Sequence, residues 1–189
     1  MTLRISIDLE DSDLDHFRLI MKEARQAAGR ATEEEIIAAA EDLLGQVRGG
    51  KVPAYIQERL EKLRVLTDML RDEEWQLPDE EKSRVINALA YFAEPEDLIP
   101  DHIPGLGFLD DAIMVELVVR ELRHEIEAYQ DFCDFRVREE ARRGRKNEDP
   151  VTREEWLRSR RRELHSRMRR RRRTERKRGG SRRSPLSLF

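Results

Sequence analysis

The chain has 189 residues, of which 41% are charged and 38% hydrophobic, a composition that fits one domain with an appendage. Its single cysteine, Cys133, excludes an intramolecular disulfide framework and suits a reducing compartment. The N-terminus has no apolar signal-peptide segment, and no stretch reaches 18 uninterrupted apolar residues. We therefore expect a cytoplasmic protein, with peripheral attachment to the inner membrane left open.

The net charge of −3 conceals two parts of opposite charge. Residues 142–189 contain 20 Lys and Arg but 6 Asp and Glu, a balance of +14, which leaves −17 for residues 1–141. This asymmetry indicates an acidic body followed by a basic tail, and each part has its own preferred partners.

The N-terminal residues alternate between apolar and polar from Leu3 to Leu9, which predicts a short strand or extended arm within residues 1–11. Because no second alternating run is present, this arm would either pack against a helix or pair with another copy of the chain.

Four helices are predicted next, because each has a cap or a proline at its start and apolar residues at helical spacing. Their expected starts are Ser12, Thr32, Pro53 and Pro78. Thr32 and Glu35 have the spacing of a capping box. Gly29 and the pair Gly49–Gly50 are the expected ends of the first two helices.

The C-terminal half predicts two more helices. Asp110 and Asp111 would begin the longest one, which runs to about Arg143, and Thr152 would cap the last one. From about Arg169 the chain is so charged that we expect it to be disordered without a partner. The fold class is therefore an all-α helical bundle, with a body over 12–143 and an Arg-rich helix and tail over 144–189.

The segment between Tyr91 and Asp111 cannot be one helix, because it holds three of the seven prolines and two of the nine glycines. It predicts a rigid helix–loop–helix corner, in which aspartates accept hydrogen bonds from free backbone amides. The corner residues are Tyr91, Pro95, Asp97, Pro100, Asp101, Pro104, Gly107, Asp110 and Asp111.

The order of these corner residues resembles the signature of the YkvA-like domain of unknown function, over about residues 85–120. The resemblance implies a conserved helix–loop–helix, no established activity and a loose association with membranes in some members. Glu94, Glu96 and His102 stand where the family commonly has small, aliphatic or aromatic residues. Because carboxylates are costly in hydrocarbon, these departures argue against membrane insertion of this chain.

The same segment offers an alternative interpretation as a metal site. Carboxylates together with a histidine can hold a hard divalent cation, and the candidate ligands are Asp97, Asp101, His102, Asp110 and Asp111. However, no known metal motif is present, and helix capping accounts for the acids without a cofactor. We therefore expect no cofactor, no catalytic residues and no enzyme, with a metal-dependent enzyme as the alternative.

The basic tail predicts contact with a polyanion, since arginine dominates and binds phosphate in a bidentate way. The candidate residues are Arg160, Arg161, Arg162, Arg169, Arg170, Arg171, Arg172, Arg173, Arg176, Lys177 and Arg178. RNA, DNA or the ribosome is the expected partner, and an anionic membrane surface is the first alternative. A solvated tail, or one that folds back on its own acidic body, is the second.

The last five residues, PLSLF, resemble the peptide by which bacterial replication and repair proteins dock on the sliding clamp. Its anchors here would be Leu186, Leu188 and Phe189, with Pro185 in place of the usual glutamine.

The sequence as a whole predicts a non-enzymatic helical scaffold whose Arg-rich tail contacts a polyanion. The rival is a peripheral membrane protein that uses the tail together with the loop over residues 98–109. A protein partner is compatible with either interpretation, and the oligomeric state is left open.

Overall fold

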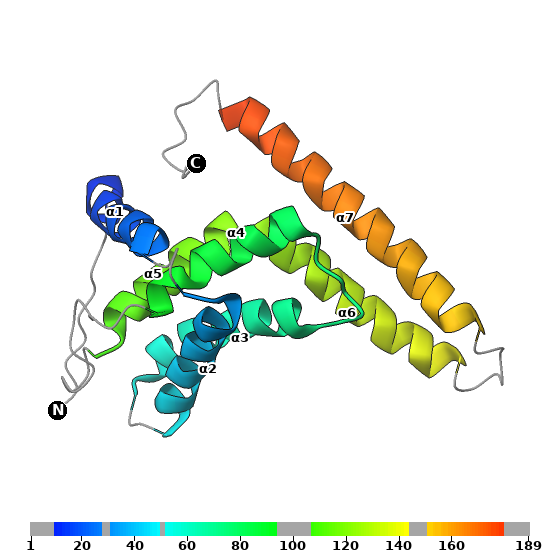
Figure 1. The fold of residues 1–189 in the computed structure, drawn as a ribbon, viewed down its shortest axis with the longest axis horizontal. Helices are drawn as coiled ribbons and strands as arrows, with labels where there is room; N and C mark the ends of the chain where they lie inside the picture. The colour runs from blue at the N-terminus through cyan, green and yellow to red at the C-terminus, as the bar shows by residue number, and fades with distance from the viewer. Residues whose placement is uncertain (1–9, 28–30, 50–51, 94–106, 144–150, 180–189) are drawn as a thin grey trace.

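The computed structural model describes residues 10–27, 31–49, 52–93, 107–143 and 151–179, and over these ranges it is an all-α bundle without strands (Figure 1). This confirms the predicted fold class. The elements are α1 (Asp11–Ala27), α2 (Glu33–Gly49), α3 (Ala54–Arg71), α4 (Asp79–Leu89), the 3-10 helix η2 (Ala90–Ala93), α5 (Leu109–Glu121), α6 (Arg123–Arg143) and α7 (Val151–Gly179). The predicted arm over 1–11 lies almost wholly outside the described residues.

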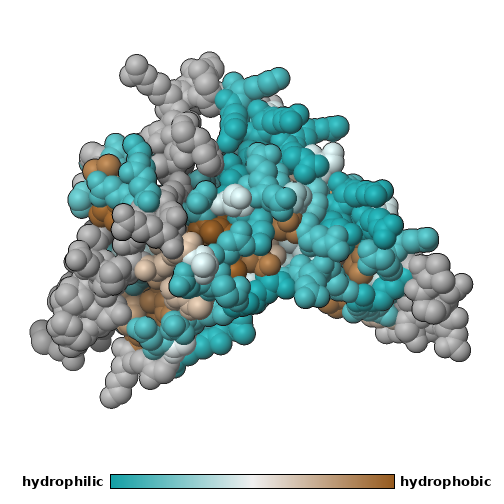
Figure 2. Space-filling view, in the orientation of Figure 1, coloured by the Kyte–Doolittle hydropathy of each residue, from teal (hydrophilic) through white to brown (hydrophobic). Residues whose placement is uncertain are grey.

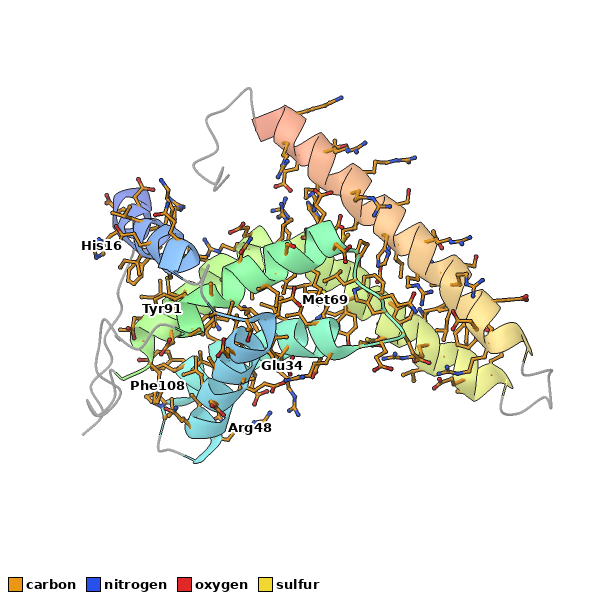
Figure 3. All side chains as sticks on the ribbon, in the orientation of Figure 1. His16, Glu34, Arg48, Met69, Tyr91 and Phe108 are labelled. Atoms are coloured by element: carbon orange, nitrogen blue, oxygen red, sulfur yellow. The ribbon has the colours of Figure 1, made fainter. Side chains whose placement is uncertain are left out.

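The helix α3 forms the centre of the body. Its fully buried residues recur at helical spacing, and they are Ile56, Leu60, Leu63, Leu66 and Met69. This stripe lets α3 pack against α2 and α5 and contact α6. Figure 3 shows Met69 near the middle of the molecule, among the side chains of the core.

Local signals place the starts of α2, α3 and α4 as the sequence predicts, whereas α1 begins at Asp11 and α7 at Val151, so the predicted caps Ser12 and Thr152 lie inside their helices. The Thr32 hydroxyl accepts a hydrogen bond from the Glu35 amide at 3.2 Å, and the Glu35 carboxylate accepts one from the Thr32 amide at 2.7 Å. These bonds lower the pKa of Glu35. Pro53 and Pro78 are the residues directly before α3 and α4.

The predicted long helix from Asp110 to Arg143 is two helices, which corrects the sequence prediction. They are separated at Leu122, whose φ of −98° and ψ of 16° are not helical. The Leu122 side chain is fully buried, so packing into the core outweighs the local preference for a continuous helix. α5 therefore ends at Glu121, and α6 begins at Arg123.

The prediction of disorder beyond about Arg169 is wrong for the described part of the tail, because α7 continues to Gly179. α7 packs alongside α6, and the two helices run in opposite directions at one side of the molecule (Figure 1). The surface over this side is hydrophilic in Figure 2. The helical turns beyond Arg169 make ion pairs with residues of α4 and α6.

Candidate polyanion-binding face

α7 packs against the turn between α3 and α4. The Asp72 carboxylate accepts hydrogen bonds from the backbone amides of Glu74 and Trp75 at 2.9 and 3.1 Å. Arg136 and Tyr129 of α6 donate to the same carboxylate, which ties the turn to α6. The turn thereby fixes the Trp75 ring and the Glu74 backbone beside α7.

The face of α7 toward the body carries the few apolar residues of the helix. Leu157, Leu164 and Met168 are buried there, at spacings that keep them on one side of a helix. The His165 ring packs edge-on against Trp75, with ring centroids 4.3 Å apart. The Arg161 guanidinium donates to the Glu74 backbone oxygen at 2.6 Å. Together these contacts dock the N-terminal two-thirds of α7.

Burial lowers the pKa of His165. Desolvation lowers the pKa of this imidazole to about 4, and the nearby charges of Arg169 and Arg161 act in the same direction. The docked helix therefore holds His165 in its neutral form at pH 7.

The charged guanidinium of Arg172 is mostly buried between α7 and the body. Its guanidinium donates to Glu125 of α6 at 3.1 Å and to Glu80 of α4 at 2.8 Å, and it lies 3.5 Å from Glu81. The Arg172 side chain is only 12% exposed, and those of Glu81 and Glu125 are each 1% exposed. Arg84 is a second cation beside Glu125, at 3.3 Å. Arg172, Glu81 and Glu125 thus form a buried ion-pair cluster with the exposed Glu80 at its edge, so Arg172 is bound to carboxylates rather than available to a ligand.

A second set of ion pairs runs along the more exposed border between α6 and α7. Arg167 pairs with Asp131, Arg171 pairs with Glu127 at 2.8 Å, and Glu175 pairs with Arg123 and His124. Each step of four residues forward along α7 corresponds to a step of four backward along α6. The antiparallel register of the two helices therefore matches acid to base repeatedly.

The face of α7 away from the body carries cations without an acidic partner among the described residues. These are Arg162, Arg169, Arg170, Arg173 and Lys177. The last four, with Ser166 and Thr174, line a shallow open depression. In Figure 3, side chains that end in nitrogen project from α7 on the side away from α6. The row spans about 22 Å along the helix at 1.5 Å per residue. We call these five residues the outer row.

The structure thus divides the predicted polyanion-binding residues into several groups. Five form the outer row. Arg161 and Arg172 are held inside the protein, and Arg171 is paired with Glu127 at the border. Arg160 pairs with Glu163 and stacks over Phe135, its guanidinium carbon 5.2 Å from the ring centroid. Arg176 also has an interaction within the protein, and the side chain of Arg178 lies outside the described residues.

Only part of the predicted corner is described. Tyr91 and Asp110 lie buried on either side of the undescribed segment, and the Tyr91 hydroxyl approaches the Asp110 carboxylate at 3.5 Å. Asp110 and Asp111 stand in the first turn of α5, as predicted, directly after Phe108, whose φ is 64°. Gly107 is buried beside them, and Tyr91 and Phe108 lie toward the same end of the molecule in Figure 3.

The remaining corner residues, Pro95, Asp97, Pro100, Asp101 and Pro104, and the candidate metal ligand His102 lie outside the described residues. Within the described ranges no group of three or more His, Cys, Asp or Glu side chains is placed to hold a metal ion. The metal alternative rests mainly on undescribed residues and stays a prediction. The same holds for the clamp peptide with Leu186, Leu188 and Phe189.

The acidic partners of α7 were missed by sequence reasoning. They are Glu74, Glu80, Glu81, Glu125, Glu127, Asp131 and Glu140. A signal for two of them exists: Glu127 and Asp131 are four residues apart, and so are Arg167 and Arg171. Such a match is informative only once α6 and α7 are known to be antiparallel neighbours.

The fold and these contacts define a small helical protein in which a basic C-terminal helix is docked on an acidic body. A family model described as a protein of unknown function (DUF1232) matches residues 82–117, which cover most of α4, all of η2 and most of α5. A Bacillus subtilis (strain 168) protein named "Uncharacterized membrane protein YkvA" is 34% identical over 91 residues, which cover 43% of this chain and 84% of the relative. The chain therefore belongs to this YkvA-like family.

Two further findings concern solved structures and membrane spans. No solved structure matches the chain. Among the helices that the structure describes, none combines the length and the apolar character needed to cross a membrane. α7 lies outside the segment that the family model matches, so the outer row is a feature of this chain beyond the matched region.

Proposed function

We propose that the protein is a non-enzymatic helical scaffold that binds RNA or DNA, free or in the ribosome, through the outer row of α7. The observation that supports this proposal is that the two faces of α7 differ in whether their cations have acidic partners. Acidic residues of the body pair with its inner and border arginines, whereas the outer row has no acidic partner in the described structure. A helix face that bears five cations attracts a polyanion.

The chemistry of the outer row suits a phosphate backbone. Four of its five residues are arginines, which can donate two parallel hydrogen bonds to one phosphate. Its small polar neighbour Ser166 can donate to a phosphate oxygen as well, whereas the Thr174 hydroxyl donates to the Arg170 backbone oxygen at 3.0 Å. Phosphate contacts carry little sequence information, so we expect binding without strong base preference.

The test compares two variants of equal charge. The first replaces the outer row: Arg162→Gln, Arg169→Gln, Arg170→Gln, Arg173→Gln and Lys177→Gln. The control replaces five exposed cations of the body: Lys22→Gln, Arg48→Gln, Arg59→Gln, Arg64→Gln and Arg120→Gln. Binding to a labelled RNA oligonucleotide and to a DNA duplex is measured by fluorescence anisotropy at several salt concentrations.

We expect the outer-row variant to lose binding and the control to keep it. For five phosphate contacts on duplex DNA, wild-type affinity should fall about 500-fold between 50 and 200 mM salt. Wild-type protein that binds neither nucleic acid, or an equal loss in the two variants, would contradict the proposal.

A peripheral membrane protein is the second candidate, and one observation favours it. The Bacillus subtilis relative carries the word "membrane" in its name. In this candidate the outer row meets anionic lipid headgroups, and the loop over residues 98–109 lies at the interface. The same two variants, sedimented with vesicles of phosphatidylglycerol or of phosphatidylcholine, distinguish it from the first. Retention on phosphatidylglycerol alone, without nucleic-acid binding, would favour the membrane.

A further inference from the structure

The border between α6 and α7 holds two arginines beside the outer row that are occupied by acids of the same chain. Arg167 pairs with Asp131, and Arg171 pairs with Glu127 at 2.8 Å. Arg167 lies three residues before Arg170 on the helix, and Arg171 is the next residue after it. Arg167 therefore neighbours Arg170 on the helix surface, whereas Arg171 is turned about 100° from Arg170 and neighbours Arg167 instead.

These two border pairs differ from the Arg172 network in their exposure. The side chains of Arg171 and Glu127 are 50% and 52% exposed, whereas that of Arg172 is 12% exposed. An exposed ion pair contributes little to stability and is weakened by salt, so its partners can exchange for other ions. The buried network cannot exchange in this way without leaving charges unpaired in the interior.

α7 also contacts the body through residues outside the border pairs. Leu157, Leu164 and Met168 are buried against the body, and Arg172 is fixed by carboxylates of α4 and α6. The arginines of the border can therefore turn from carboxylate to phosphate while the helix stays docked. Phosphate offers the same paired oxygen acceptors as a carboxylate.

We propose that Glu127 and Asp131 act as an autoinhibitory contact, in which two carboxylates of α6 compete with the polyanion for Arg171 and Arg167. This inference rests on the proposed function of the outer row. When a polyanion binds, the two arginines exchange their carboxylate partners for phosphates, and the cationic face grows from five to seven residues. The Glu127 and Asp131 carboxylates thereby lower the affinity of α7 for the polyanion without contacting it.

The experiment is a double-mutant cycle in the full-length protein. One change removes the competing charges (Glu127→Gln with Asp131→Asn), and the other removes the arginines that they hold (Arg167→Gln with Arg171→Gln). A control with Glu23→Gln and Glu58→Gln removes two exposed acids of α1 and α3. Affinity for one RNA oligonucleotide is measured by anisotropy at constant salt, and thermal unfolding of each variant verifies that it is folded.

We expect removal of Glu127 and Asp131 to tighten binding about 2- to 30-fold, the range for two exposed pairs that no longer have to break. The same removal should have little effect when Arg167 and Arg171 are already glutamine. The control should change affinity by less than about twofold in either background.

The outcomes separate this inference from the proposed function. An equal gain with and without Arg167 and Arg171 would mean that the acids act only through their general negative field, which overturns the inference and leaves the proposed function intact. If the wild type binds and the Glu127/Asp131 variant binds more tightly only while Arg167 and Arg171 are present, the inference is supported. If neither binds, both proposals fail.

Discussion

At the scale of the residue, one arginine of the basic helix has a purely structural environment. Arg172 sits between Glu80, Glu81 and Glu125, from two different helices of the body. Its neighbour Arg173 lies on the outer row and is exposed. Two adjacent residues of identical chemistry therefore have different roles, because the helix turns one inward and the other outward.

Replacing Arg172 tests this difference. Arg172→Met should lower the free energy of unfolding by about 3 kcal/mol, because it leaves Glu81 and part of Glu125 buried without their cation. Arg173→Met should change it by about 0.5 kcal/mol or less, as for an exposed surface residue. Urea unfolding followed by circular dichroism measures both values. Equal effects of the two substitutions would contradict the buried network.

His165 supplies a pH dependence at the same scale. Its pKa in the folded protein is about 4, below the value of 6.5 for a free imidazole, so between pH 6.5 and 4 the unfolded chain binds a proton that the folded chain does not. The free energy of unfolding should therefore fall as the pH drops through this window. In His165→Phe, which can keep the aromatic contact with Trp75, the fall should be smaller. Urea titrations at several pH values would show it, and identical slopes for both proteins would contradict it.

At the scale of the element, local sequence signals predict the starts of α2, α3 and α4 and the end of α2 at Gly49, but not the break between α5 and α6 or the length of α7. Some of these signals act within a few residues, so the sequence alone reveals them. They are the capping box of Thr32 and Glu35 and the prolines before α3 and α4. The break at Leu122 has no such signal, since it follows from burial of that side chain. The length of α7 likewise depends on partners such as Glu125 that are distant in sequence.

The candidate site shows the same limit. Composition alone predicts a polyanion-binding tail, and the outer row belongs to that prediction. The inward residues could have been separated from the rest, because Leu157, Arg161, Leu164, Met168 and Arg172 follow helical spacing. What the sequence cannot supply is the facing helix, and without it Glu127 and Asp131 are ordinary exposed acids.

At the scale of the whole molecule, the opposite charges of the two parts meet within one fold. Residues 1–141 carry −17 and residues 142–189 carry +14, and ion pairs join the two parts along α6 and through the turn at Glu74. Attraction between the parts thus adds to stability, whereas a uniformly charged protein is destabilised by self-repulsion.

Salt should therefore destabilise this protein. We expect the melting temperature to fall as NaCl rises from about 20 to about 500 mM, because screening weakens the exposed pairs between α6 and α7. The Glu127→Gln, Asp131→Asn variant should show a smaller fall, and the outer-row variant should show the same fall as the wild type. Differential scanning fluorimetry measures all three. A melting temperature that rises with salt in the wild type would contradict the expectation.

The position of α7 after the body also has a consequence for biosynthesis. Trp75 is fully buried and packs against Phe132 of α6 and His165 of α7. The ribosome makes the 29 residues of α7 after all the helices on which it rests, which takes about 1.5–6 s at 5–20 residues per second. During that interval the side of Trp75 that meets His165 is uncovered. Until α7 docks, the nascent body therefore leaves part of this aromatic core residue uncovered.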